Sequence, residues 1–383
     1  MPISNGPFDG ILVVDLSHVL AGPFATMLLS DLGARVIKVE RPGSGDDSRA
    51  FGPFKDGKSL YFAFVNRGKE SVALNLKHPD DKALFEAMVR KADVLVENFR
   101  PGTMDRLGYT WEALQAMNPR LIYASASGYG QSGPKKVEPA YDTVIQAASG
   151  MMSMTGVPGG PATKVGTSMA DLTTGMYTFS AIASALYGRE KTGKGARVDI
   201  AMLDSMFSLL EGGLMHYAAT GEDPPRLGNR HPSITPFDTF AAADKPFVIC
   251  AGDNALFNNL VTAIGRPELA TDARFTDNNL RTENAVALRD ELEKALSTQP
   301  ASYWLPIIDK AGIPCGPIND IASVIADPQI AARNMYIDVG GIKMPGNPLK
   351  ISGYDDPFER PEAPALDANS AAIRNEFLDA AKN

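Results

Sequence analysis

Short apolar runs rich in Val and Ile alternate with longer amphipathic stretches along the first third of the chain. A short apolar run is typical of a buried strand, and apolar residues every three or four positions are typical of a helix. The runs predict strands at 11–17, 35–40, 71–77, 93–98 and 120–126, with helices at 23–32, 79–91 and 110–117. Strands that alternate with helices predict an α/β fold with an open, mostly parallel sheet.

The middle of the chain continues this pattern and then changes. Helices are predicted at 141–152, 172–188 and 204–219, with a strand at 198–203. Segment 220–236 is rich in Pro, Gly and charge, which indicates a domain boundary. Beyond it, two adjacent strands within 237–252 and helices at 254–264, 285–297 and 300–311 predict a smaller α+β domain. The tail from residue 334 is Pro-rich and shows little periodicity before a last helix predicted at 369–381.

The composition is that of a globular protein with an acidic balance. The 383 residues are 44% hydrophobic and carry a net charge of −8, which disfavours a general nucleic-acid or anionic-membrane binder. Cys250 and Cys315 are the two cysteines and lie far apart, so neither a disulfide framework nor a thiolate metal cage is expected. The first ten residues lack a signal-peptide pattern, and no apolar run is long enough to span a membrane. A cytoplasmic location is therefore expected.

Several common ligand motifs are missing. The turn after the first predicted strand, 18–23, contains Gly22 alone where a dinucleotide fold commonly has G-x-G-x-x-G. No P-loop sequence occurs, and the lack of an H-E-x-x-H sequence disfavours a zinc hydrolase. Segment 43–47, GSGDD, is more typical of a turn than of a metal site, so no metal is predicted.

Basic and polar residues follow the ends of several predicted strands. Arg41 follows the second strand, Lys77 ends the third, and Asn98, Phe99 and Arg106 follow the fourth. Ligands of a parallel α/β sheet bind beyond the carboxyl ends of its strands, so this edge suits a small molecule rich in phosphate. The alternative is that these are ordinary solvated loop charges.

Asp171 precedes a long apolar helix and has two possible roles. Aspartate is among the best helix caps, and a purely structural cap is one interpretation. The helix N-terminus also favours a carboxylate, and a carboxylate can act as a nucleophile toward an activated acyl group. Ser168 lies in a G-x-S-x-A sequence that only loosely resembles a serine-hydrolase elbow, which makes a serine nucleophile a weaker hypothesis.

Long motifs spread over nearly the whole chain resemble the class III CoA-transferase (CaiB/BaiF-type) family. They include DLSHVLAGPFATM from residue 15, ERPGSGDD from residue 40, ENFRPGTMDRLG from residue 97, SMADLTTG from residue 168 and GIPCGPIND from residue 312. The resemblance is greatest to the branch that moves CoA from succinyl-CoA to glutarate. It implies a Rossmann-like large domain, 1–222 completed by 334–383, a small α+β domain, 223–333, and an interlocked homodimer.

The resemblance also implies roles for individual residues. The family's nucleophilic aspartate falls on Asp171, which would form an aspartyl-CoA thioester. The positions that contact CoA fall on His18, Val19, Ala21, Arg41, Leu74, Lys77, Asn98, Phe99, Arg106, Tyr141 and Asp142. CoA thioesters would be substrates, and no tightly bound cofactor is expected.

Two departures bear on the reaction. Formyl-CoA transferases have Gln where this chain has Leu20, and they have a glycine-rich loop in the small domain that is not found here, which argues against oxalate and formyl-CoA. Racemases of the family have a catalytic His where this chain has Tyr141, which disfavours a 2-methylacyl-CoA racemase. A CoA-binding protein without turnover is a further alternative.

The resemblance to the glutarate-transferring branch implies a small dicarboxylate acceptor of about four to six carbons, of which one carboxylate would react while Arg binds the other. Arg230 and His231, at the domain boundary, are the candidates for binding it. No nucleic-acid or membrane partner is expected.

Overall fold

The computed structural model describes residues 5–378 and divides them into two compact units. Unit 1 comprises the described parts of Met1–Met152, Lys164–Thr220 and Pro328–Asn383, and unit 2 comprises Ser153–Thr163 and Gly221–Asp327. The domain boundaries expected after residues 222 and 333 stay predictions, because compactness alone does not show that a segment folds independently.

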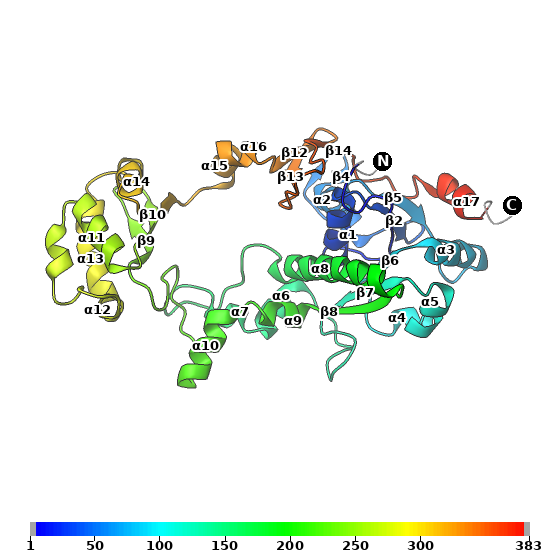
Figure 1. Ribbon diagram of the computed structural model, residues 1–383, viewed down its shortest axis with the longest axis horizontal. Coiled ribbons are helices and arrows are strands. Elements are labelled where there is room, and N and C mark those ends of the chain that lie inside the picture. The colour runs from blue at the N-terminus through cyan, green and yellow to red at the C-terminus, as the bar shows by residue number, and fades with distance from the viewer. Residues whose placement is uncertain (1–4, 379–383) are drawn as a thin grey trace. The chain divides into compact units, whose positions relative to one another are not determined.

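Unit 1 is built on a six-stranded sheet in which every neighbouring pair of strands is parallel (Figure 1). The strand order is β5-β2-β1-β6-β7-β8. The strands are β1 (Leu12–Asp15), β2 (Arg35–Glu40), β5 (Glu70–Ala73), β6 (Val94–Glu97), β7 (Ile122–Ser127) and β8 (Ala196–Ala201). The predicted α/β fold with a mostly parallel sheet is therefore confirmed.

Helices cover both faces of this sheet, which explains why its strands are apolar at successive positions. Val13 faces a cluster that contains Leu29 of α1 (Ala21–Asp31) and Ile182 of α8 (Met169–Thr192). Val14 faces the opposite cluster, which contains Phe85 of α3 (Pro79–Lys91). Helices α5 (Trp111–Met117) and α17 (Ser370–Leu378) also contribute to this second cluster.

The strand order reverses between β1 and β6. From β1 the chain proceeds outward to β2 and β5, and then returns to β6 on the other side of β1 before it continues to β7 and β8. Such a reversal opens a crevice beyond the carboxyl ends of the two central strands, where doubly wound folds bind ligands. The loops after Asp15 and Glu97 therefore border the expected ligand site.

Unit 2 contains a three-stranded antiparallel sheet with the order β11-β10-β9. Its strands are β9 (Phe237–Ala241), β10 (Pro246–Cys250) and β11 (Cys315–Pro317). The helices are α11 (Asn254–Ala263), η2 (Pro267–Thr271), α12 (Asn278–Glu283), α13 (Ala285–Leu296), α14 (Ala301–Lys310) and α15 (Ile321–Ile325). A core that includes Phe247, Phe257 and Leu292 joins the sheet to the helices, as an α+β unit requires.

Several predicted elements are wrong in detail. The helix predicted at 141–152 is two helices, α6 (Asp142–Ala148) and α7 (Met151–Met154), because Gly150 between them takes a left-handed φ of 94°. The helix predicted at 204–219 is also two, α9 (Met202–Phe207) and α10 (Glu211–Thr220). The strand predicted at 71–77 ends at Ala73, so Leu74 and Lys77 lie in a loop.

Other elements were not predicted. They are η2, α12, β11 and α15 of unit 2, and in unit 1 η1 (Asp47–Ala50), β3 (Phe54–Lys55), β4 (Lys58–Ser59), α2 (Leu60–Asn66), α4 (Thr103–Arg106), α16 (Pro328–Ala332), β12 (Tyr336–Val339), β13 (Ile342–Pro345) and β14 (Glu359–Arg360). The last three form a small sheet in the tail, where little order was expected. Of the helix predicted at 369–381, residues 379–381 lie outside the described part of the chain.

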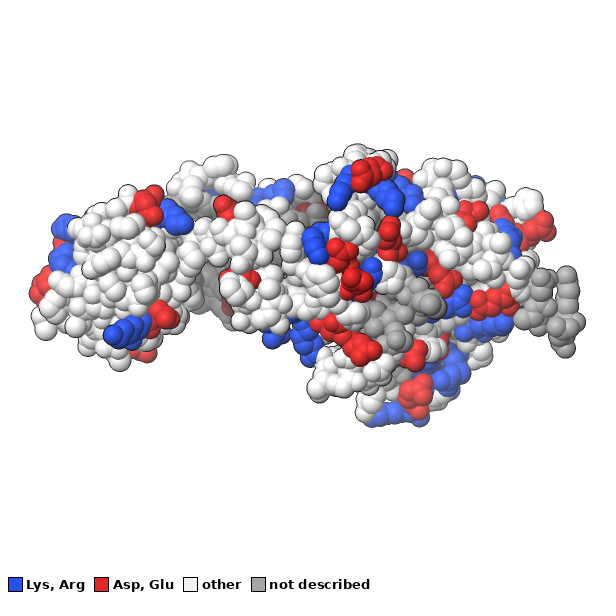
Figure 2. Space-filling view, turned by 90° about the horizontal axis from the view of Figure 1, so that it is seen from above, with Lys and Arg blue, Asp and Glu red and all other residues white. Residues whose placement is uncertain are grey.

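The surface has mixed charge. On the face shown in Figure 2, basic and acidic side chains are interspersed, and no large area is basic alone. None of the helices within residues 5–378 is long and apolar enough to cross a membrane.

Candidate active site

Two hydrogen bonds hold the turn after β1 against the residue that follows β6. The Asn98 side chain accepts a hydrogen bond from the His18 backbone N–H at 2.8 Å and donates one to the His18 carbonyl at 2.7 Å. Gly22 is required behind this turn, because a Cβ there would lie 2.3 Å from the Ser17 Cβ. The Asn98 side chain thus holds together the two loops that border the crevice.

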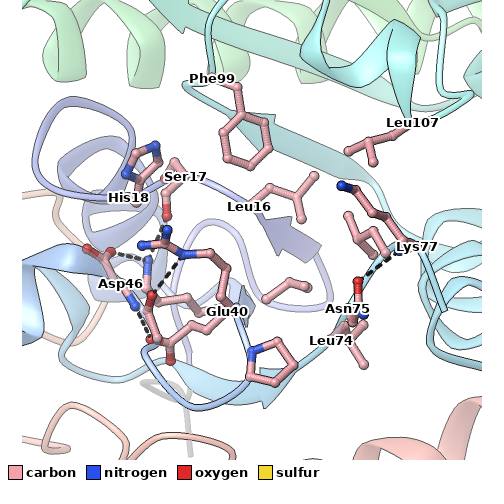
Figure 3. Close-up of a pocket in the computed structure, with 16 residues that line it drawn as sticks. Leu16, Ser17, His18, Glu40, Asp46, Leu74, Asn75, Lys77, Phe99 and Leu107 are labelled. Atoms are coloured by element: carbon pink, nitrogen blue, oxygen red, sulfur yellow. Dashed lines mark hydrogen bonds and ion pairs between the residues drawn. The ribbon is translucent and has the colours of Figure 1, made fainter.

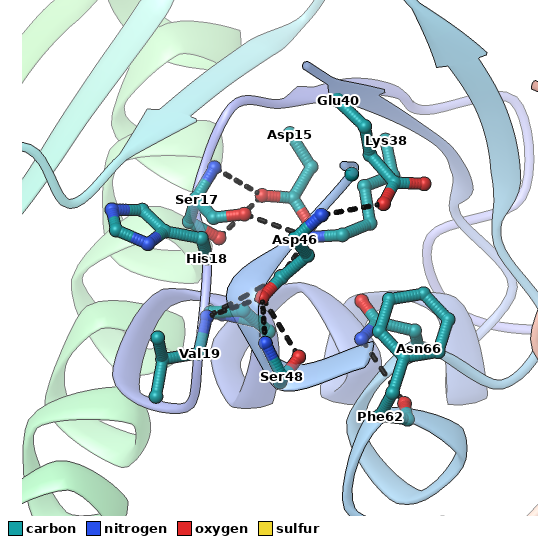
Figure 4. Close-up of polar contacts among 12 residues, drawn as sticks. Asp15, Ser17, His18, Val19, Lys38, Glu40, Asp46, Ser48, Phe62 and Asn66 are labelled. Atoms are coloured by element: carbon teal, nitrogen blue, oxygen red, sulfur yellow. Dashed lines mark hydrogen bonds and ion pairs between the residues drawn. The ribbon is translucent and has the colours of Figure 1, made fainter. Parts of the chain in front are cut away.

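Buried ion pairs lie behind the turn, and Figure 4 shows Lys38 and Asp46, which form one of them. The Lys69 Nζ lies 3.0 Å from the Asp15 carboxylate and also donates to Thr26 and Asn66. The Lys38 Nζ lies 2.8 Å from the Asp46 carboxylate and donates to the Ser17 carbonyl. Both lysines are almost fully buried, and each has an acidic partner, so these cations stabilise the fold rather than serve as free ligand-binding groups.

Asp46 links this buried layer to the turn itself. Its carboxylate accepts a hydrogen bond from the backbone N–H of Val19, which has a left-handed φ of 68°. Burial raises the pKa of Asp46, but Lys38 and hydrogen bonds from Ser48 outweigh it and hold the pKa far below the usual range. Asp46 therefore stays ionised and can hold the strained Val19 backbone in place.

A cavity of about 400 Å³ lies against this turn (Figure 3). Five residues of the predicted CoA-binding set line it: His18, Arg41, Leu74, Lys77 and Phe99. His18 and Asp46 lie on one side of the cavity and Lys77 on the opposite side (Figure 3). The walls between them are largely apolar, with Leu16, Leu76 and Leu107.

Two exposed cationic side chains line this cavity. Arg41 is exposed and makes an ion pair with Asp47, and Lys77 is also exposed. The His18 ring lies 5.7 Å from the Phe99 ring, centroid to centroid, and burial lowers the pKa of His18. The cavity therefore combines basic groups at its surface with apolar and aromatic walls, a combination that suits a nucleotide phosphate attached to a base.

The remaining predicted contacts lie outside the cavity lining. Ala21 begins α1, and the Val19 N–H is bound to Asp46. Arg106 lies on α4 and donates to the Thr103 hydroxyl. Tyr141 is exposed, whereas Asp142 is buried.

Asp171 does not cap α8. The helix begins at Met169, two residues earlier, and the N–H groups of Ala170 and Asp171 point to the Asp142 carboxylate at 2.8 and 3.4 Å. No hydrogen bond to the Asp171 carboxyl group is found among the described residues. Asp142 therefore caps the helix from α6, which leaves the Asp171 carboxyl group available for chemistry.

The surroundings of Asp171 favour its protonated form. The side chain is partly buried, and burial followed by the charge of Asp142 raises its pKa to about 7. A carboxylate with a raised pKa is more basic and more nucleophilic than an ordinary aspartate.

Tyr61 of α2 shares this neighbourhood and was missed in the sequence. Burial raises the pKa of its phenol to about 12, with further contributions from Asp171, Asp142 and Asp46. Tyr61 is therefore close enough to Asp171, Asp142 and Asp46 for their negative charges to affect its ionisation. No sequence signal identifies Tyr61, since α2 itself was not predicted.

Close packing connects α8 with α1. A Cβ at Gly175 would lie 2.7 Å from the Ala21 carbonyl oxygen and 2.9 Å from the Phe24 ring. Asp171 lies four residues earlier and so on the same face of α8. The glycine thus lets the helix that carries Asp171 approach the helix that follows the His18 turn.

Arg230 and His231 belong to unit 2. The His231 ring stacks on Phe237 with centroids 5.3 Å apart, and its Nδ1 accepts a hydrogen bond from the Ser233 N–H at 3.2 Å. A neutral His231 ring then carries its proton on Nε2, which can donate to an oxygen. Arg230 lines a small cavity beside the Arg289–Asp238 ion pair. Their role toward an acceptor stays a prediction.

No group of three or more His, Cys, Asp or Glu side chains that could hold a metal occurs among residues 5–378.

Comparison with known proteins gives a consistent result. A family model described as CoA-transferase family III matches residues 8–370. The chain is 61% identical to the acetyl-CoA:oxalate CoA-transferase of Acetobacter aceti, over 97% of this chain and 96% of that protein. It is 38% identical to the succinate–glutarate CoA-transferase of Agrobacterium fabrum, over 98% and 97%. A CaiB/BaiF family protein from Brucella suis has a similar structure, with a TM-score of 0.88, 41% identity and coverage of 98% and 100%.

Proposed function

The chain belongs to CoA-transferase family III, and from this premise we propose that it transfers CoA from acetyl-CoA to oxalate through an aspartyl-CoA thioester on Asp171. Membership makes the protein an enzyme of the CoA-transferase type, which acts on CoA thioesters and carboxylic acids. The alternative of a CoA-binding protein without turnover is therefore wrong.

The observation that supports Asp171 most directly is its isolation from cations. Asp15, Asp46 and Glu40 each have a basic partner, whereas Asp171 lies next to a second carboxylate. Pairing with a cation would stabilise the carboxylate and weaken it as a nucleophile. Asp171 is thus suited to attack a thioester.

The reaction proceeds by acyl exchange in four steps. The Asp171 carboxylate attacks the acetyl carbonyl carbon, the C–S bond breaks, and a mixed anhydride and CoA thiolate form. The thiolate attacks the aspartyl carbonyl carbon, which releases acetate and leaves the aspartyl-CoA thioester. Oxalate then attacks this thioester, and the released thiolate attacks the oxalyl carbonyl carbon. Oxalyl-CoA leaves, the Asp171 carboxylate is restored, and no net proton or electron is consumed.

CoA would be bound at the cavity beside β1. We assign its phosphates to Arg41 and Lys77, with Arg106 farther along the same edge, and its adenine to the His18 and Phe99 rings. Binding energy from these remote groups can lower the barrier at the reacting carbon. Unit 1 is accordingly the proposed CoA-binding domain.

The substrate pair rests on relatedness. The relative named for acetyl-CoA and oxalate is 61% identical, whereas the one named for succinate and glutarate is 38% identical. Oxalate is a dicarboxylate, as expected, but shorter than the four to six carbons predicted. The higher identity outweighs the argument against oxalate from Leu20 and from the missing glycine-rich loop, because two local features are weaker support than similarity along the whole chain.

The second candidate pair is succinyl-CoA and glutarate. Relatives of this name in Agrobacterium fabrum and Homo sapiens are 38% and 37% identical to the chain, over nearly its full length. If glutarate is the acceptor, Arg230 and His231 are the proposed ligands of its second carboxylate.

A matrix of donors and acceptors tests the substrate assignment. Acetyl-CoA and succinyl-CoA are each incubated with oxalate, glutarate or butyrate, and new CoA thioesters are identified by mass spectrometry. We expect oxalyl-CoA from acetyl-CoA at the highest kcat/KM. Glutaryl-CoA formation at a higher kcat/KM would favour the second pair, and transfer to butyrate alone would contradict both.

We further propose that two copies of the chain form an interlocked homodimer. Large apolar side chains are exposed on α8, α9 and α10: Tyr177, Tyr187, Phe207, Met215 and Tyr217. Exposed apolar area of this kind is typical of surfaces that become buried when two protein chains associate. Light scattering should give twice the chain mass of 40.9 kDa, and a monomeric mass would contradict the dimer.

A further inference from the structure

Gln146 is completely buried, and both ends of its amide have partners. Its Oε1 accepts a hydrogen bond from the Val165 N–H at 2.9 Å. Its Nε2 donates to the Asp142 Oδ2 at 2.7 Å and to the Thr167 carbonyl at 3.3 Å. The side chain therefore joins α6 to the loop that leads into α8, and its orientation is fixed by a donor, Val165, on one side and acceptors, Asp142 and Thr167, on the other.

Asp142 continues this connection to Asp171. With Oδ2 bound to Gln146, its Oδ1 accepts from the Ala170 N–H at 2.8 Å and faces the Asp171 N–H at 3.4 Å. The side chain is 9% exposed, so most of its surface faces protein. Both carboxylate oxygens are thus occupied at the N-terminus of α8, and little of the group is left for a ligand.

We propose that Asp142 and Gln146 are positioning residues that fix the backbone at the start of α8 and thereby aim the Asp171 carboxylate. This inference rests on the proposed function, in which Asp171 is the nucleophile. It assigns Asp142 a role different from the CoA contact that the family resemblance implied, and it gives Gln146 a role for the first time. The exposed Tyr141 next to Asp142 stays available for a ligand.

The inference predicts a specific kinetic signature. A residue that contacts CoA should raise the KM for acyl-CoA when it is lost. A residue that aims the nucleophile should lower kcat and leave that KM nearly unchanged, since misplacement of a reacting group by about 1 Å costs about 100-fold in rate.

The structure offers an exchange of hydrogen-bonding groups as the test. In Asp142→Asn, the new side chain can still accept from Ala170, but its NH₂ group meets the NH₂ group of Gln146. In Asp142→Asn/Gln146→Glu, the asparagine can donate to the new carboxylate, which also accepts from Val165. The double variant therefore restores a donor–acceptor match between the two side chains and keeps the net charge, although it loses the 3.3 Å hydrogen bond to the Thr167 carbonyl.

The pH dependence gives a second readout. The ionisable groups that interact electrostatically with Asp171 are Asp142 from α6 and Tyr61 from α2. Helix α1 carries only Asp31, which is paired with Arg67, and α9 carries only the exposed Asp204. In Asp142→Asn, loss of the nearest negative charge should move the rise of kcat/KM to lower pH. The same shift follows from loss of the charge whether or not Asp142 aims Asp171, so it shows that Asp171 is the titrating nucleophile, and the positioning role is measured by kcat and KM.

We expect Asp142→Asn to lower kcat about 100-fold with the KM for acyl-CoA within about twofold, and the double variant to recover about tenfold or more. Thermal melting checks that each variant is folded, and if Asp142→Asn is not, Gln146→Glu and the double variant carry the same comparison. A raised KM with normal kcat, or no recovery in the double variant, would overturn the inference.

Asp171→Asn is measured alongside to separate the two proposals. If Asp171→Asn is active, the proposed function fails. If Asp171→Asn is inactive while Asp142→Asn and Gln146→Glu behave as wild type, the positioning inference alone fails.

Discussion

The cavity beside β1 and the surroundings of Asp171 lie in the same unit but differ in whether their buried carboxylates are paired with cations. Beneath the cavity, Lys38 and Lys69 are buried and each is paired with an aspartate. At Asp171 two carboxyl groups lie together, and no cation contributes to the pKa shift. Burial acts on both groups, but at Asp46 the Lys38 cation and hydrogen bonds outweigh it and lower the pKa, whereas at Asp171 burial and the charge of Asp142 raise the pKa to about 7.

The difference follows from what each region has to do. A binding site needs a rigid backbone and exposed cations, and buried pairs provide rigidity without adding net charge to the pocket. A nucleophilic carboxylate must instead stay reactive, so a nearby cation would be harmful. The same residue type, aspartate, thus serves as a structural anchor at Asp46 and as the proposed nucleophile at Asp171.

The largest stability effect is expected for Lys69→Met. This change leaves Asp15 as a buried charge without its cation, which should cost about 3–5 kcal/mol of unfolding free energy. Urea unfolding monitored by circular dichroism measures the loss. Asp171→Asn is the matched comparison, because it removes a carboxyl group that no cation stabilises and should leave the unfolding free energy the same or higher. Equal destabilisation by both variants would contradict the contrast between the two regions.

A smaller effect, on binding, is expected for Arg41→Ala. Loss of a charge-assisted contact to phosphate costs about 1.5–3 kcal/mol, so the KM for acyl-CoA should rise about 10- to 150-fold. Arg106→Ala should raise it less, because Arg106 does not line the cavity, and Arg90→Ala on α3 is the control for loss of a surface charge. If all three variants behave alike, the cavity is not the phosphate site.

The pH dependence should follow Asp171. The nucleophile is the carboxylate, so kcat/KM for acyl-CoA should rise as the pH increases through about 7. The folded-state pKa lies above the ordinary value of 3.8, so the folded protein binds more protons between these values and Asp171 lowers stability as the pH rises from about 4 to about 7. Asp171→Asn should remove this contribution. A flat kcat/KM profile between pH 5.5 and 8.5 would contradict the raised pKa.

The sheet of unit 1 was predictable because its strands are buried on both faces. Val13 and Val14 face different helical layers, so the strand is a continuous apolar run that stands out in the sequence. The predicted ends were less accurate, and Lys77 lies in a loop rather than in β5. The small sheet at β12–β14 was missed because buried positions alternate with more exposed ones along its strands, so no continuous apolar run marks them.

The site was predictable only in part. His18, Arg41 and Lys77 follow strand ends, and that position alone brings them to one edge. The hydrogen bonds of Asn98 to the His18 backbone and the capping of α8 by Asp142 depend on contacts between segments far apart in sequence. No local sequence pattern encodes such contacts. Tyr61 was missed for the same reason, since its relevance comes from the charges near it in the fold.

Trapping the covalent intermediate tests the central claim most directly. The enzyme is mixed with acetyl-CoA and treated with hydroxylamine, which converts an aspartyl thioester to a hydroxamate, and the peptide that contains Asp171 is sequenced by mass spectrometry. The account predicts a hydroxamate on Asp171 in the wild-type enzyme and none in Asp171→Asn, with Asp204→Asn labelled as in wild type. A modified residue other than Asp171, or an unmodified Asp171 in an enzyme that turns over, would contradict it.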